Sequence, residues 1–186
     1  WELDAGLAGE RLVEAAKALW SLGNLQGARV ALDAAIDADP DGADTLLAVL
    51  AFVLVEGDRP RALDALHRTL GSIEVSDYHK VYASLWEVAE ARRRGEAPDR
   101  LASEFLSRRD GRLWPDALAR LVTGRAQLGE LVAGATSPGR RADLMYYAAV
   151  FGADARRRDD LLAGVVQTRM VMFFEYDRAR LWLARP

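Results

Sequence analysis

The sequence predicts an all-α fold, a superhelix of antiparallel helical hairpins that ends in a capping helix. Three observations favour it. Apolar residues recur at helical rather than alternating spacing, glycine and proline punctuate the chain at short intervals, and one helical unit is echoed 34 residues later. With 186 residues, of which 51% are hydrophobic, the chain is long enough for one helical-repeat domain over residues 1–186.

The echo defines the first two hairpins, expected over residues 9–42 and 43–76. The residue pairs that lie 34 positions apart are Gly23 and Gly57, Asn24 and Asp58, Ala28 and Ala62, and Leu32 and Leu66. Small residues let two helices approach closely, and larger apolar residues fill the space to the next hairpin. This period and pattern resemble tetratricopeptide repeats (TPRs). Pro40 ends the first unit, whereas the second has Glu74 in place of the closing proline.

Apolar stripes predict the helices inside these units. In the first helix, the positions of the TPR's Trp, Leu-Gly and Tyr are taken by Leu12, Ala15, Ala16 and Leu19. The stripe of the second helix consists of Leu25, Ala28, Leu32, Ala35 and Ile36. The third helix contains ten residues without a polar side chain, from Leu46 to Val55, and we expect it to be an inner helix of the array. A further stripe over residues 62–70 predicts the fourth helix.

The later units follow the repeat less closely. A third is expected over residues 77–110, but its glycine, Gly95, comes four residues late. Pro98 is expected to open a helix through about Ser107, because proline suits the first helical position. Degenerate hairpins are expected at 114–136 and 138–170, and the capping helix at 174–185.

A second resemblance is narrower. The segment "LWPDALARLVTGRAQLGELV" is similar to one in bacterial TPR proteins related to the outer-membrane lipoprotein adaptors that organise peptidoglycan hydrolases. The residues that carry it are Trp114-Pro115, Arg120-Leu121, Gly124-Arg125 and Glu130-Leu131. In that group the final helical hairpin is followed by a sequence like "FVEY" and a closing helix. The segment "FFEYDRARLWLA" stands at the corresponding position of this chain. The resemblance spans about Ala8 to Leu183 and implies a protein-binding adaptor rather than an enzyme.

No residue set in the sequence predicts catalysis, a metal site or a cofactor. The chain has no cysteine, which excludes disulfides and thiolate chemistry. Its histidines, His67 and His79, stand alone. The segment Asp37–Gly42 matches the start of an EF-hand loop, but Ala48 replaces the glutamate that closes the calcium shell. We therefore expect a protein that is not an enzyme.

The charge pattern does not indicate a basic surface that would bind nucleic acid. The net charge is −3, and the arginines are scattered. Two arginine triplets, at 92–94 and 156–158, are interpreted as helix-end and surface charge rather than as a phosphate or nucleic-acid site. No transmembrane segment is predicted, since the longest apolar run is ten residues and a spanning helix needs about 20. Bacterial cytoplasm and periplasm or envelope are both open, because a leader or anchor can precede Trp1.

In TPR arrays the first helix of each hairpin lines the concave face. By position, this geometry assigns partner contacts to Val13, Lys17, Trp20, Leu47, Ala51, Leu54, Tyr78 and Leu85. The surface is mainly apolar, and it lacks the lysine and asparagine with which some TPR proteins grip a C-terminal carboxylate. It is therefore expected to bind a protein or peptide segment, such as an amphipathic helix or an extended apolar stretch.

Other occupants of this groove are open from the sequence. The chain's own C-terminal helices can cover it, or a second copy can dock, which would make the chain a homodimer or an oligomerisation module of a larger protein. The residues Leu181 to Leu183 cover three directions of the capping helix and are a candidate dimer contact. The third hypothesis is an enzyme or a regulator that binds a small ligand, and it requires a deep polar pocket that contains both a base and an acid.

Overall fold

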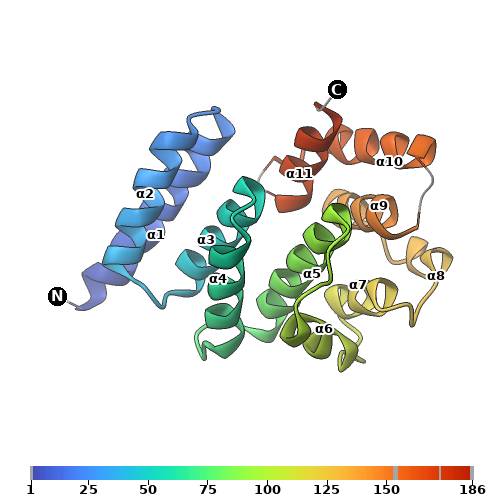
Figure 1. The fold of residues 1–186 in the computed structure, drawn as a ribbon, viewed down its shortest axis with the longest axis horizontal. Helices are drawn as coiled ribbons and strands as arrows, with labels where there is room; N and C mark the ends of the chain where they lie inside the picture. The colour runs from blue at the N-terminus through green and yellow to red at the C-terminus, as the bar shows by residue number, and fades with distance from the viewer. Residues whose placement is uncertain (1, 153–154, 172, 185–186) are drawn as a thin grey trace. The chain divides into compact units, whose positions relative to one another are not determined.

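The computed structural model describes residues 2–152, 155–171 and 173–184, with no side chain described for residues 2–5 and 155. The helices are α1 (Glu2–Ser21), α2 (Leu25–Ala38), α3 (Ala43–Glu56), α4 (Arg59–Gly71), α5 (Asp77–Arg94), α6 (Arg100–Ser107), α7 (Trp114–Val122), α8 (Leu128–Val132), α9 (Pro138–Phe151), α10 (Ala155–Gln167) and α11 (Phe174–Leu183) (Figure 1). The described chain contains no strand, which confirms the all-α prediction. None of its helices has the length and apolarity needed to cross a membrane.

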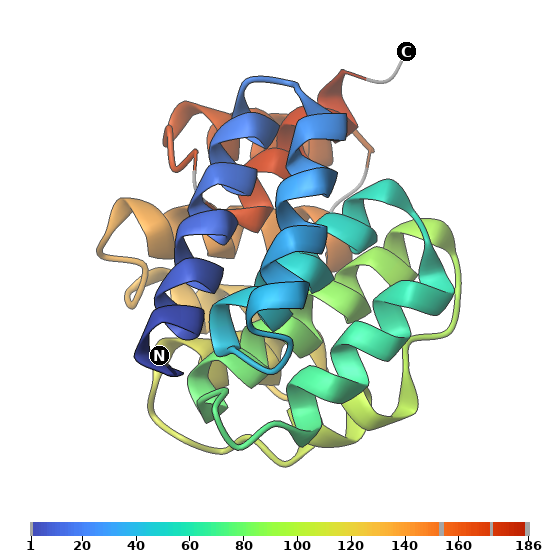
Figure 2. The ribbon, with the colours of Figure 1, turned by 90° about the vertical axis from the view of Figure 1, so that its left-hand side faces the viewer.

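The chain divides into two compact units, Trp1–Ala83 and Ser84–Pro186. The division falls inside α5, so this helix begins in the first unit and ends in the second. The first unit contains the pairs α1 with α2 and α3 with α4, and α1 and α2 run side by side (Figure 2).

The turns inside the two pairs are built alike. Gly23 and Gly57 have φ angles of +79° and +88°, a left-handed conformation that glycine adopts without a Cβ penalty. The next residue caps the following helix: Asn24 accepts a hydrogen bond from the Gly27 amide, and Asp58 accepts one from the Arg61 amide. The 34-residue echo therefore reproduces the backbone conformation and the cap as well as the residue types.

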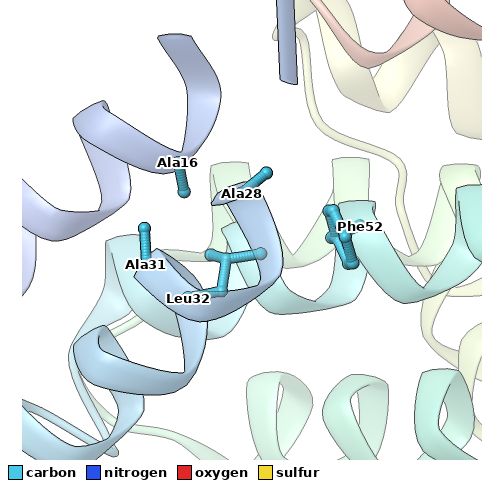
Figure 3. Close-up of a cluster of buried hydrophobic side chains, with 5 residues drawn as sticks. All are labelled: Ala16, Ala28, Ala31, Leu32 and Phe52. Carbon is cyan, nitrogen blue, oxygen red and sulfur yellow. The ribbon is translucent and has the colours of Figure 1, made fainter. Parts of the chain in front are cut away.

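Small buried residues set the distance between the helices of a pair. Ala16 of α1 and Ala31 of α2 face each other across the first pair, and Phe52 of α3 belongs to the same cluster (Figure 3). Ala28 and Leu32 belong to the same cluster, and their echoes Ala62 and Leu66 are buried as well. Alanine at these positions loses little entropy on burial and lets helix backbones approach, so leucine and phenylalanine make the contacts between pairs.

The third unit changes the pattern at its turn. Gly95 again has a positive φ, +70°, but the capping residue is Asp99, which accepts from the Ala102 amide. The helix therefore begins at Arg100, and the prediction that Pro98 opens it is wrong. Pro98 cannot be the first helical residue because the Asp99 backbone is extended, as a cap requires, and the helix follows it.

In the second unit, α7 and α9 each carry a proline in the first turn, Pro115 and Pro138. Helix α9 contacts α10, and α10 contacts α11. The pairs α7 with α8 and α9 with α10 fall inside the segments expected to be degenerate hairpins, and α11 falls inside the expected capping helix. Residues 153, 154 and 185 of those expected segments lie outside the described residues.

Candidate functional site

The three predicted site residues of α1 differ in their surroundings. Val13 is buried in the core. Lys17 is partly exposed, and its Nζ lies 2.7 Å from Oε1 of Glu14 on the same helix. Trp20 is partly exposed and places its ring edge-on to Phe52, at 4.9 Å between centroids. On α1, Lys17 and the outer part of Trp20 are therefore the predicted residues that a partner can reach.

The predicted residues of α3 divide in the same way. Leu47 and Ala51 are partly exposed, whereas Leu54 is buried. The apolar run of α3 is covered on most sides because α1, α2 and α4 all contact this helix. Leu47 and Ala51 are one turn apart and mark the side of the run that is not fully covered.

The two residues of α5 end up in different units. Tyr78 lies in the first unit, is exposed, and packs its ring against Tyr82 and His79 at 5.3 and 5.4 Å. Leu85 lies in the second unit and is fully buried there. Helices α1 and α3, which carry six of the predicted residues, contact each other, and Leu85 lies in the core of the second unit.

A small hollow adjoins the same two hairpins. Its walls come from α2, α3 and α4, and they include Arg29, Asp33, Ile36, Val49, Val53 and Arg61. It has room for about one water molecule. Close to it, Nη2 of Arg29 lies 2.7 Å from both carboxylate oxygens of Glu56, an ion pair that joins the first hairpin to the second. The hollow is too small for a cofactor.

The second unit contains a buried polar network that the sequence interpretation missed. At its centre is Glu175 of α11, whose Oε1 accepts hydrogen bonds from Nε1 of Trp86 at 3.0 Å and from the Tyr147 hydroxyl at 2.9 Å. The Trp86 ring also stacks on Phe174, at 4.9 Å. Burial, and then the charge of Asp143, raise the pKa of Glu175 to about 8. These contacts hold the start of α11 against α5 and α9.

A second part of this network is an ion pair between α5 and α11. Arg178 donates to Glu90 through Nε at 2.7 Å and through Nη2 at 2.8 Å, and both side chains are buried. Arg93 also donates to Glu90, at 2.9 and 3.0 Å. Tyr146 of α9 lies near these charges, and burial raises the pKa of its hydroxyl well above the ordinary range. A buried pair of this kind is costly to break, because the charge that remains has no partner.

Three more buried carboxylates fix helix starts and loops in this unit. Asp143 accepts from Nε1 of Trp114 at 2.8 Å, which joins α9 to α7. Asp116 accepts from Nε of Arg109 and from the Leu113 amide. Glu87 accepts from the Asp99 amide with both oxygens. The acids of the network are thus bonded to indole, phenol, guanidinium and amide donors, which indicates a role in positioning helices.

The sequence contained a signal for this network. Glu87 and Glu90 are one turn apart and have apolar neighbours in the segment "LWEVAEA" of α5, and Glu175 and Arg178 are one turn apart in the phrase "FFEYDRAR". Charged residues are almost never fully buried unless they are paired, so partners are expected for charges in such apolar segments. Among the described residues, no group of three His, Cys, Asp or Glu side chains could hold a metal ion.

Comparison with known proteins adds no family. No protein-family model matches the chain, and searches of curated proteins and of solved structures find no match either.

Proposed function

We propose that the chain is a TPR-like helical-repeat scaffold that binds a protein or peptide segment and catalyses no reaction. The observation that carries the proposal is the repetition of a complete turn after 34 residues: a left-handed glycine, a capping side chain, a buried alanine and a buried leucine. Arrays of such hairpins stack into superhelices, and their open faces bind partners.

The binding surface in this proposal is the inner face of α1 and α3, defined as Lys17, Trp20, Leu47 and Ala51. All four are partly exposed, and they lie on helices that contact each other. The face is apolar with one cation, which suits an amphipathic helix or an extended apolar segment. Val13 and Leu54 support this face from the core of the first unit, because both are buried.

The narrower resemblance to bacterial TPR adaptors of the envelope is part of the proposal. Its residues have identifiable structural roles. Trp114 and Pro115 are buried at the start of α7, and Gly124 has a φ of +73°. Arg125 donates to Leu106 O at 2.8 Å and to Asp110 at 2.6 Å. These roles support a shared fold, and the adaptor activity follows as a hypothesis.

The test is a selection of peptides from a displayed random library on the purified chain, followed by measurement of affinity by fluorescence anisotropy. Leu47→Glu should weaken the selected peptides about tenfold or more, because it places a charge in the apolar contact. Val30→Glu is the matched control, since Val30 is an exposed apolar residue on α2, outside this face. Circular dichroism confirms that both variants are folded.

The proposal would be wrong if the two variants lost peptide affinity equally. It would also be wrong if Leu47→Glu bound the selected peptides as tightly as the wild type does. Leu54 is left unchanged, because a glutamate at this buried position would unfold the hairpin.

An oligomerisation module is the second candidate function. It is favoured by the exposed apolar side chains Leu22, Leu25 and Val30 around the turn from α1 to α2. Light scattering coupled to size exclusion separates the two candidates: a concentration-independent monomer supports the receptor, whereas a dimer that Leu22→Asp dissociates supports the module.

A further inference from the structure

Helix α11 buries few large apolar side chains. Its buried residues are Phe174, Glu175, Arg178 and Ala179. Two of these are charged, whereas α9 buries seven residues, two of them tyrosines. A helix with few buried apolar contacts belongs to the part of a fold that opens locally while the remainder stays intact. The docking of α11 therefore depends strongly on its two buried charged residues.

These two residues have partners of different kinds. Arg178 pairs with Glu90 of α5, so each charge has a counter-charge. Glu175 accepts hydrogen bonds from Nε1 of Trp86 and from the Tyr147 hydroxyl, and both donors are uncharged. Within the described part of the chain, no cation forms an ion pair with Glu175. A buried carboxylate without a counter-charge is costly, so α11 docks with this carboxyl in its protonated form, which still accepts through one oxygen.

The groups on α9 reinforce this preference for the protonated form. Burial, and then the charge of Asp143, raise the pKa of Glu175 to about 8, although its own amide and the donors Tyr147 and Trp86 favour the carboxylate. The hydroxyls of Tyr146 and Tyr147 remain uncharged at pH 8, because burial raises the pKa of both well above the ordinary range. Helix α9 thus offers Glu175 a negative charge and neutral hydroxyls, but no counter-charge.

Other charged groups at the contacts of α11 are paired with one another. The pairs are Arg178 and Arg93 with Glu90, Arg180 with Asp177, and Arg158 with Asp159. Asp177 also titrates near neutral pH, since burial raises its pKa to about 6. Any pH dependence of α11 must therefore be divided between Glu175 and Asp177 by a variant.

We propose that α11 is a pH-sensitive cap of the second unit, which opens locally while the other helices stay folded and opens more often once the Glu175 carboxyl ionises. The released helix exposes this carboxyl to water, where the carboxylate is well solvated. The docked helix keeps it buried beside Asp143. Ionisation therefore stabilises the released form relative to the docked form. This equilibrium is separate from the peptide binding of the proposed function.

The test is hydrogen exchange of the full chain, measured by mass spectrometry at pH 6, 7 and 8. Protection factors correct for the intrinsic effect of pH on exchange, so they report the equilibrium between docked and released α11. In the released helix Glu175 has its ordinary pKa of 4.5. Linkage then predicts that each pH unit below 8 lowers the protection of residues 178–183 by up to about tenfold, and the fall from pH 6 to 8 should be at least about tenfold.

Glu175→Gln is the decisive variant, and the protection of its α11 should change by less than about threefold over this range, with the remainder due to Asp177. The matched control is Glu104→Gln, which removes a carboxylate that is 41% exposed on α6 of the same unit, and it should follow the wild type. In all three proteins the amides of α9 should stay at least about tenfold more protected than those of α11, because α11 opens without them.

Three results would overturn the proposal. The first is wild-type protection of α11 that does not change with pH, and the second is equal protection of α9 and α11. Both are read from the wild type, so they decide the question even if Glu175→Gln does not fold. The third is a pH dependence in Glu175→Gln as steep as in the wild type.

Discussion

Glu175→Gln isolates the cost of a buried carboxyl group at the start of α11. The glutamine keeps a side-chain oxygen that can accept from Trp86 Nε1 and the Tyr147 hydroxyl, so the packing and these two hydrogen bonds are preserved. It removes the ability to ionise. The difference between the two proteins therefore reports the protonation of one group, in the field of the neighbouring Asp143.

The direction in which stability changes with pH follows from the raised pKa of Glu175. In the unfolded chain the glutamate ionises around its ordinary pKa of 4.5, whereas in the folded chain its pKa is about 8. Below pH 4.5 both states are protonated, and the folded state suffers no penalty. Between pH 4.5 and 8 the unfolded state loses its proton first, so stability falls by up to about 1.4 kcal/mol per pH unit. The loss is complete above pH 8 and is of the order of 5 kcal/mol.

The assay is urea unfolding followed by circular dichroism between pH 5 and 9. The free energy of unfolding of Glu175→Gln should exceed that of the wild type by only about 1 kcal/mol at pH 5 and by about 3–5 kcal/mol at pH 8.5. The exposed Glu10 provides the control, and Glu10→Gln should follow the wild-type curve. The pKa of Asp177, raised to about 6 by burial, affects all three proteins alike and cancels. A stability difference that does not change with pH would refute the reasoning.

Three further predictions concern the first unit, and thermal or urea unfolding checks each of them. Phe52→Ala should lower the free energy of unfolding by about 3–5 kcal/mol, because it opens a cavity against Trp20. Its control is Ile73→Ala, at a side chain that is 94% exposed, which should change the free energy of unfolding by less than about 0.5 kcal/mol. Similar losses in the two variants would show that Phe52 is not a core residue. Gly57→Ala should lower the free energy of unfolding by about 1–2 kcal/mol, since the φ angle of Gly57 is +88°. Its control is Gly71→Ala, where a Cβ meets nothing within 4 Å, and this variant should not be destabilised. Asp58→Ala and Asn24→Ala should each cost about 1 kcal/mol, and a loss at one position alone would contradict the equivalence of the two turns.

The features that repeat in the first two helix pairs have local determinants in the sequence. A glycine that adopts positive φ, an Asx cap and an alanine-leucine stripe all act within about a dozen residues, so their repetition after 34 positions is visible in one dimension. The third unit shows the limit of this approach. Glu96 to Pro98 separate its glycine from its cap, and the buried alanine follows the cap by three residues instead of four.

The polar network could not be predicted in the same way, because its partners are distant in the sequence. Glu90 and Arg178 are 88 residues apart, and Trp86 and Glu175 are 89 apart. The apolar neighbours of Glu90 and Glu175 in the sequence indicate burial, but they do not show which partner each charge has. Trp20 is a similar case, since its helical position suggests an open face, while its actual neighbour is Phe52 of the next hairpin.

The contact between Trp86 and α11 also has a spectroscopic consequence. The indole of Trp86 stacks on Phe174 and donates its N–H to Glu175, so the start of α11 supplies both a ring contact and a hydrogen bond to this residue. Indole emission shifts to longer wavelength as water gains access to the ring. Trp86 is therefore a built-in optical reporter of α11 docking, and if the other four tryptophans are replaced by phenylalanine, its emission can follow the release of this helix in real time.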